Sequence, residues 1–117
     1  VSLYDPTLAV DLVEFEATAV SNQAVRLSWE TASETNNFGF NLYRNTHNEF
    51  ATATKIHFEP SNLANQAGAS YQYDDLGLSF GSYYYWLEDI DTSSGVGDLT
   101  HASFTLSLNA IAESGMG

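Results

Sequence analysis

Cysteine is missing from this 117-residue chain. Its absence excludes disulfide bonds, thiolate catalysis and zinc sites with cysteine ligands. It leaves the compartment open, because only paired cysteines argue strongly for an oxidising one. Hydrophobic residues make up 44% of the chain, which is ordinary for a globular protein. The sequence can therefore form one domain with a packed core and no cross-links.

Basic residues are scarce as well: Arg26, Arg44 and Lys55 stand against 15 acidic residues, for a formal net charge of -12. Binding to phosphates needs clusters of Lys and Arg, so this balance excludes a nucleic-acid partner and attraction to an anionic membrane surface. No apolar run approaches the roughly 18 residues of a membrane-spanning helix. The acidity suits solubility, a cationic partner or divalent ions.

Alternation of apolar and polar residues is the main pattern, and a period of two predicts strands. Such a strand is predicted around Val25, Leu27 and Trp29. Upstream of it, the residues from Val13 to Ala19 alternate in the same way, whereas Val10 and Leu12 fall on the other parity. The change of parity predicts a β-bulge or bend near Leu12–Val13.

Further strands are expected at residues 38–44, 54–58, 70–73, 82–91 and 100–108. In the first of these, Phe38, Phe40 and Leu42 are expected on one face, with Asn41 and Tyr43 on the other. Polar or glycine-containing segments such as 33–37 and 59–68 separate the strands. Short strands without a sustained helical period predict an all-β fold, a seven-stranded antiparallel sandwich.

Three stretches of the chain carry a resemblance to a known family. They are residues 10–17 (VDLVEFEA), 25–44 (VRLSWETASETNNFGFNLYR) and 81–91 (GSYYYWLEDID). In the second stretch, a tryptophan in one predicted strand is followed by Tyr-Arg at the end of the next, at the spacing that this family uses. The chain resembles the fibronectin type III superfamily, most of all the bacterial variety that recurs in large secreted and cell-surface proteins.

The resemblance implies an immunoglobulin-like sandwich over residues 10–109, with an N-terminal arm or linker at residues 1–9 and a C-terminal tail at 110–117. It implies that a tyrosine at the start of the sixth strand, Tyr83 or Tyr84, bonds back to the backbone as in a tyrosine corner. It also implies a protein that is secreted or on the cell surface of a bacterium. Trp29 becomes the central core ring, surrounded by Leu27, Phe40, Leu42 and Leu87.

Residues suited to catalysis do not converge anywhere in the sequence. His47, His57 and His101 lie in or beside predicted loops and strand edges, with no nucleophile motif near them. No phosphate-binding glycine loop or His-Glu-x-x-His segment occurs. Because an active site is recognised by groups that converge on one reaction, we expect that the protein is not an enzyme.

Calcium is the one cofactor that the sequence suggests. Asp89, Asp91 and Asp98 flank a predicted turn that contains glycine, and calcium prefers several carboxylate oxygens among its ligands. The spacing lacks the regular alternation and final glutamate of a helix-loop-helix calcium site. A solvated acidic turn is the alternative interpretation.

Four consecutive aromatic residues, 83–86, load both faces of the sixth predicted strand. Tyr84 and Trp86 face one way and Tyr83 and Tyr85 the other, so one pair is expected in the core. The outer pair, if it is Tyr84 and Trp86, is a candidate platform for stacking a sugar ring. Packing against side chains of neighbouring strands is the commoner alternative.

The functional expectation is a non-catalytic extracellular module, a spacer or adhesive domain of a surface or secreted protein. A second hypothesis is a subunit of an extracellular filament, joined by strand pairing of a terminal arm that carries Leu3, Tyr4 and Leu8. A third is a carbohydrate-binding accessory module. The expected partners are neighbouring protein domains, copies of the chain itself or carbohydrate, without nucleic acid or membrane insertion.

Overall fold

The computed structural model describes residues 10–34, 36–62, 67–91 and 97–108. Within these ranges the fold is all-β: apart from one short 3-10 turn, η1 (Phe50–Thr52), the regular elements are strands. None of the described residues forms a helix long and apolar enough to span a membrane. The predicted arm (residues 1–9) and tail (residues 110–117) lie outside the described residues.

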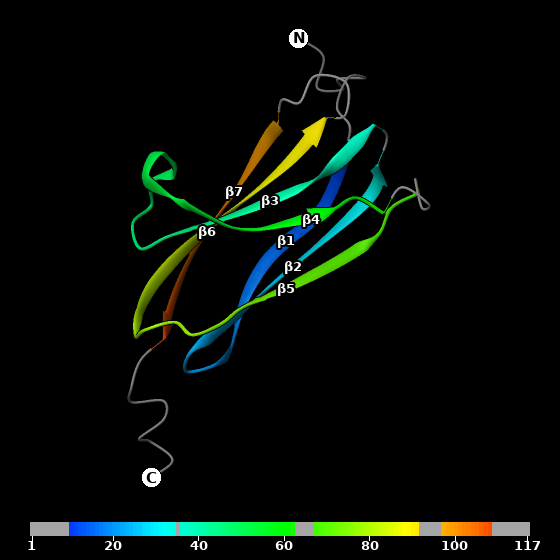
Figure 1. Cartoon of the computed structure of the whole chain (residues 1–117). Coiled ribbons are helices and arrows are strands. Elements are labelled where there is room, and N and C mark those ends of the chain that lie inside the picture. Colours follow the sequence, from blue (N-terminus) through cyan, green and yellow to red (C-terminus); the bar gives the residue numbers. More distant parts are fainter. Residues whose placement is uncertain (1–9, 35, 63–66, 92–96, 109–117) are drawn as a thin grey trace.

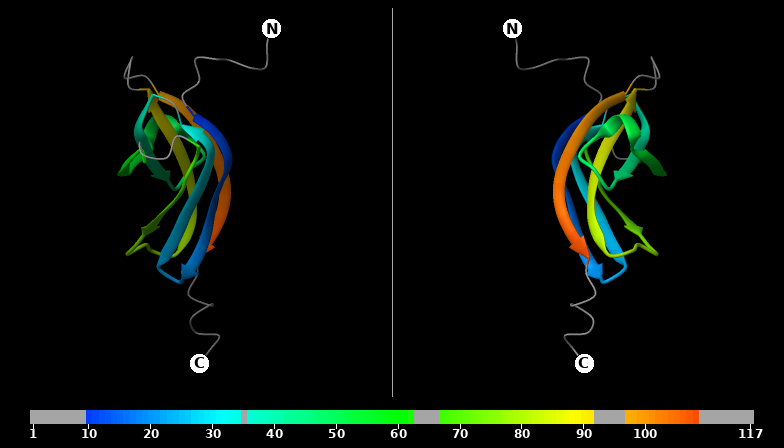
Figure 2. Two further views of the ribbon diagram at one scale, coloured as in Figure 1. Left: turned by 90° about the vertical axis from the view of Figure 1, so that its right-hand side faces the viewer. Right: turned by 90° about the vertical axis from the view of Figure 1, so that its left-hand side faces the viewer.

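The strands form two antiparallel sheets that face each other as the layers of a sandwich (Figures 1 and 2). Sheet A has the order β1-β2-β5, and sheet B the order β4-β3-β6-β7. The strands are β1 (Val10–Ser21), β2 (Ala24–Glu34), β3 (Asn37–Asn45), β4 (Thr54–Pro60), β5 (Ser70–Asp75), β6 (Gly81–Asp91) and β7 (Gly97–Leu108).

Trp29 of β2 occupies the centre of the core, as predicted, and is almost fully buried. Its indole ring stacks on Tyr71 of β5 at a centroid distance of 5.4 Å and meets the ring of Phe40 edge-on at 5.6 Å. Because Phe40 belongs to β3, these contacts join sheet A to sheet B. The other core residues predicted around Trp29 are also buried: Leu27, Leu42 and Leu87.

The predicted bulge in β1 is confirmed. The register between β1 and β2 shifts between Leu12 and Glu14, which leaves Val13 as the extra residue and exposes its side chain. Upstream, Val10 and Leu12 pack against the core, and downstream Phe15 packs against it as well. The bulge thus lets residues of both parities in β1 face the same core.

The prediction for Phe38 is wrong. It was expected on the same face as Phe40 and Leu42, yet its side chain is 58% exposed, whereas the other two are buried. The reason is a register shift between Asn37 and Gly39 in the pairing of β3 with β6. Phe38 is the extra residue there, and its ring packs outside the core on Phe58, at a centroid distance of 5.5 Å.

The aromatic run of β6 divides between the two faces as its alternation predicts. Tyr83 and Tyr85 are the core pair, and both are buried. The hydroxyl of Tyr83 donates to the carbonyl oxygen of Ser79 at 2.6 Å. The bond back to the backbone that the resemblance implied is therefore made by Tyr83, the first of the two candidate tyrosines.

We predict that Trp29→Ala lowers the free energy of unfolding by about 3–5 kcal/mol, because it removes the ring that joins the two sheets. Urea unfolding followed by circular dichroism measures this loss. Val13→Ala is the control: the residue lies on the same sheet but is exposed at the bulge, so the change should stay within about 0.5 kcal/mol. Equal losses in the two variants would contradict the assignment of the core.

Candidate functional site

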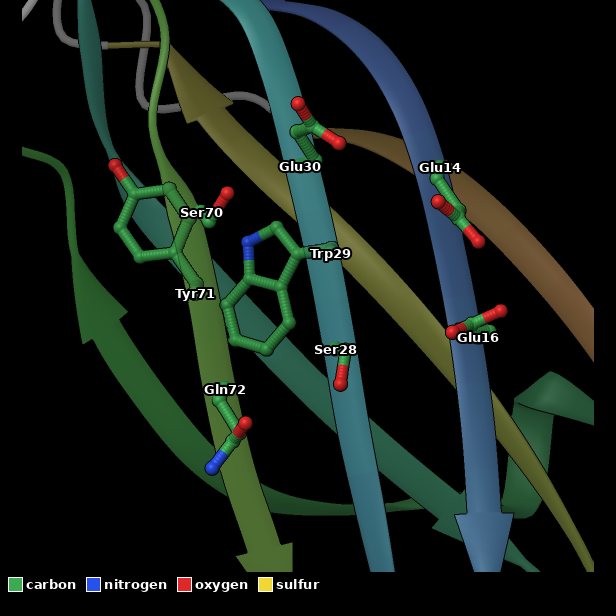
Figure 3. Close-up of a pocket in the computed structure, with 8 residues that line it drawn as sticks. All are labelled: Glu14, Glu16, Ser28, Trp29, Glu30, Ser70, Tyr71 and Gln72. Atoms are coloured by element: carbon green, nitrogen blue, oxygen red, sulfur yellow. The ribbon is translucent and has the colours of Figure 1, made fainter.

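The outer face of sheet A carries an acidic groove of about 200 Å³ (Figure 3). The strands set its lining through their register, since Glu14 lies opposite Glu30 and Glu16 opposite Ser28. Strand β5 closes the other side, because Ser28 is also opposite Gln72. The full lining is Glu14, Glu16, Ser28, Trp29, Glu30, Ser70, Tyr71 and Gln72.

Electrostatic repulsion characterises this groove. Glu16 raises the pKa of Glu14 above its ordinary value, first through a side-chain hydrogen bond and then through charge repulsion. Glu30 adds a third carboxylate directly across from Glu14, and like charges opposite each other in a sheet are destabilising. The groove therefore has the potential to attract cations.

The nearby cation on this face is already paired. Arg26 of β2 lies opposite Asp74 of β5 and donates to both of its carboxylate oxygens, at 2.8 and 3.0 Å. The carboxylate raises the pKa of Arg26, and the guanidinium lowers the pKa of Asp74, chiefly through these hydrogen bonds. The pair is partly exposed, so its contribution to stability is small.

The groove offers carboxylates, an amide and two serine hydroxyls, without an imidazole in its lining. The imidazole of His57 lies elsewhere: it stacks on Tyr73 at a centroid distance of 4.0 Å and contacts Glu59 at 2.9 Å. A hydroxyl activated by an adjacent base needs the two within hydrogen-bond reach. The lining of the groove contains no imidazole that could act as that base.

The structure brings two of the predicted calcium ligands together through the strand register. Asp89 of β6 lies opposite Asp98 of β7, whereas Asp91 pairs with Asn37 of β3. The structure describes the backbone of Asp91 and Asp98 but not their side chains, and the turn at 92–96 lies outside the described residues. Among the side chains that the structure does describe, no group of three potential ligands is placed to hold a metal. Calcium stays a prediction.

The two residues of the predicted sugar-stacking platform differ in exposure. Tyr84 is partly exposed, but Trp86 is only 3% exposed, with the ring of Phe50 from η1 against it at a centroid distance of 5.8 Å. Phe50 also meets Tyr43 edge-on at 4.8 Å. Trp86 thus takes the alternative that the sequence left open, which is packing against neighbouring side chains. The remaining predicted interaction residues, Leu3, Tyr4 and Leu8, lie outside the described residues.

The sequence interpretation missed a buried carboxylate, Glu34, at the end of β2. It is 3% exposed and accepts hydrogen bonds from three hydroxyls. Thr31 donates at 2.7 Å and Tyr71 at 2.7–2.8 Å, and Ser61 donates as well. Because these donors come from three separate segments, no spacing in the sequence could have identified them.

A second buried carboxylate, Asp75 of β5, lies near the opposite end of the sandwich. It accepts a hydrogen bond from Arg44 of β3 at 2.7 Å and another from the hydroxyl of Tyr85 of β6 at 2.9 Å. Burial and the carboxylate raise the pKa of Tyr85. One signal did exist for this network: a tyrosine in the core needs a partner for its hydroxyl.

Comparison with known proteins gives no family assignment, since no protein-family model and no curated protein matches the chain. The functional argument therefore depends on the geometry of the chain itself.

We predict that Glu16→Gln raises the melting temperature at pH 7 and leaves it unchanged near pH 3. Glu14 has a raised pKa when folded, so its contribution favours the folded state at low pH and is lost as pH rises through that pKa. Removing the Glu16 charge relieves the repulsion only where both groups are ionised. Calorimetry at both pH values tests this, and high salt should shrink the gain at pH 7. A gain of the same size at pH 3 would refute the electrostatic explanation.

We also predict that stability falls between pH 10 and pH 12 in part through Tyr71. Burial, and then Glu34, raise its pKa to about 12, while the backbone of Asn62 opposes the rise. A raised folded pKa contributes stability that is complete below the ordinary pKa and lost as pH passes the folded value. In urea unfolding, the difference between the wild-type protein and Tyr71→Phe should therefore shrink as pH rises through about 12. A constant difference would count against this linkage.

Proposed function

We propose that the chain is a non-catalytic structural and interaction module of the fibronectin type III-like kind, which serves as a spacer or adhesive unit in a secreted or cell-surface protein. One observation carries this proposal. The first and last described strands, β1 and β7, lie side by side, and β1 begins at one end of the sandwich whereas β7 finishes at the other. In that arrangement a domain can be inserted in series within a longer chain.

The strand register shows that the described chain begins and finishes at opposite ends of the sandwich. Strand β1 begins at Val10, opposite Glu34, while β7 finishes at Leu108, opposite Gly81 at the far end of β6. The two strands neighbour each other across the open side of the sandwich, as Figure 2 shows for the blue and orange ribbons. A chain that enters beside β1 and leaves beside β7 therefore gains length at each repeat.

The strand order supports the family part of the proposal. Sheet A joins β1, β2 and β5, in the manner of strands A, B and E of an immunoglobulin-like sandwich, and β3, β6 and β7 take the places of C, F and G. Here β4 pairs with β3 instead of extending sheet A. The bond from Tyr83 to Ser79 has the position of a tyrosine corner.

The chemistry of the acidic groove agrees with a role outside catalysis. Its carboxylates lie on an open sheet face, and the serine hydroxyls of its lining have no imidazole beside them. The two buried carboxylates, Glu34 and Asp75, are each satisfied by hydrogen bonds that join strands or loops. These groups therefore stabilise the fold, which is the work expected of a structural module.

We predict that the domain resists force applied between its two ends. Such force pulls β1 and β7 in opposite directions along their lengths, so that the hydrogen bonds to β2 and β6 must break together, in shear. Single-molecule pulling through the chain termini should give a high unfolding force. The absence of cysteine makes an introduced cysteine a unique attachment point.

In the control experiment, force is applied between two points that lie at the same end of the sandwich. A cysteine at Gln23, in the turn between β1 and β2, lies at the same end as Leu108, because Gln23 is bonded to Leu78 just before β6 and Leu108 is opposite Gly81, the first residue of β6. Force between Gln23→Cys and the C-terminus opens the hydrogen bonds one after another and should need clearly less force. If both geometries unfold at the same force, the in-series role loses its mechanical basis.

A further inference from the structure

The outer face of sheet B carries a carboxylate, Glu88, that two neighbours hold in one orientation. Asn41 and Tyr43 lie on this face because they alternate along β3 with the buried Phe40 and Leu42, and Glu88 of β6 lies opposite Asn41. The amide of Asn41 and the hydroxyl of Tyr43 both donate to Oε1 of Glu88, at 2.9 and 2.7 Å. Burial, and then Glu88, raise the pKa of Tyr43 to about 12, so its hydroxyl stays a donor at neutral pH.

Two oxygens of this arrangement receive no hydrogen bond from the residues that the structure describes. Both donors to Glu88 bond to Oε1, which leaves Oε2 without one. Asn41 is only 7% exposed, and its Oδ1 is a buried acceptor that lacks a donor as well. A buried acceptor without a donor is unfavourable. A ligand that suits this pair of oxygens must therefore donate hydrogen bonds.

The charge of Glu88 calls for a cationic ligand. Both arginines of the chain are paired with aspartates of β5. Lys55 lies on β4 opposite Tyr43, and in the described part of the chain no ion pair joins it to Glu88. A net charge of -12 repels anions. Calcium takes about six to eight oxygen ligands, so these two oxygens favour an organic cation with several N–H groups.

An exposed aromatic ring lies on one side of these oxygens. Phe50 of η1 packs on Tyr43 and Trp86, at centroid distances of 4.8 and 5.8 Å, and is itself 37% exposed. Trp86 lies opposite Tyr43, one outward position along β6 from Glu88. The aromatic ring that remains accessible beside the carboxylate is therefore that of Phe50. We call Asn41, Glu88 and Phe50 the acceptor site.

The ring of Phe58 limits the acceptor site on its other side. Phe58 lies opposite Asn41 in the register of β3 with β4. Its ring covers Gly39, where an added Cβ would come within 2.5 Å of it. Phe38 packs on Phe58 from outside. The two acceptor oxygens thus lie between two groups of aromatic rings, a surface that suits the apolar stem of a long cationic side chain.

We infer that the acceptor site binds an arginine side chain of a protein partner. A guanidinium has several N–H donors in one plane, so it can donate to Oε2 of Glu88 and Oδ1 of Asn41 together, while its flat face stacks on Phe50. The ammonium of lysine is strongly hydrated and does not stack in this way. Glu88 is only partly buried, so the guanidinium reaches Oε2 directly, and side-chain shifts of the kind common at interfaces give access to Oδ1.

This inference concerns a face of the sandwich, whereas the proposed spacer role concerns its two ends, so either can fail without the other. A titration of the full 117-residue chain with the peptide acetyl-Gly-Arg-Gly-amide, followed by NMR, tests it. The side-chain amide of Asn41 and the indole N–H of Trp86 should shift and saturate. The citrulline analogue has the same shape without the charge and should bind about 10-fold more weakly or worse. Equal binding of the two peptides would overturn the inference. So would a shift of these signals by maltose and not by the arginine peptide, which would assign the surface to carbohydrate.

A pair of charge variants locates the binding. Glu88→Gln keeps an oxygen for Asn41 and Tyr43 but removes the charge, and should weaken peptide binding about 10-fold or more. Glu30→Gln removes the same charge from the acidic groove of sheet A and should change the affinity less than about 2-fold. Equal losses in the two variants would show general attraction to an acidic protein and overturn the inference.

A further variant keeps the inference testable if Glu88→Gln does not fold, which circular dichroism reveals. Phe50→Leu retains an apolar cover over Trp86 but removes the aromatic face. It should weaken binding of the arginine peptide about 3-fold, because stacking of a guanidinium on an exposed ring is a modest interaction. Unchanged affinity in this variant would contradict the proposed stacking and overturn the inference.

Discussion

The stacked rings of Trp29 and Tyr71, with Phe40 edge-on from the other sheet, are the contact on which the rest of this structure depends. Each sheet has one apolar face, and such a face is stable only when another layer covers it. These three rings meet from β2, β5 and β3, so they set how the two layers lie against each other. The bulge at Val13 follows from the same constraint, because it lets both halves of β1 cover this core.

Buried polar groups fix the two ends of the same interface. At one end, Glu34 of sheet A accepts hydrogen bonds from Tyr71, whose ring is in the central stack, and from Ser61, which follows β4 of sheet B. Toward the other end, Asp75 of sheet A is bonded to Arg44 and Tyr85 of sheet B. Satisfied polar networks in a core favour one arrangement, because a shifted sheet would leave a buried carboxylate without donors. Ring packing supplies the attraction between layers, and the carboxylates specify their alignment.

The sequence predicted what short-range alternation controls and failed where a contact depends on register. The strands, the bulge near Leu12–Val13 and the burial of Trp29 all follow from the period of two and its one change of parity. Phe38 was misplaced because a register shift in β3 is invisible without the partner strand β6. The packing of Phe50 against Trp86 could not be predicted either, because Phe50 lies in a short turn more than thirty residues away in the chain.

The candidate site shows the same limit. Glu14 and Glu16 were visible as polar positions of a strand, but the acidic groove exists because the pairing of β1 with β2 adds Glu30. Glu34 could not be distinguished from the other acidic residues, because its donors come from Thr31, Ser61 and Tyr71. Local sequence identifies which residues are charged, whereas the register decides which charges meet.

Charge also determines how the sheet edges of this molecule behave. Arg26 and Arg44 are committed to Asp74 and Asp75, which leaves Lys55 as the third cation, on the edge strand β4. A lysine on an edge strand and a proline at its end, Pro60, both discourage the addition of a foreign strand. The opposing edge, β5, is only six residues long and ends in those two aspartates. This side of the sandwich therefore resists strand addition, so an assembly by strand pairing would have to use the side where β1 and β7 lie together.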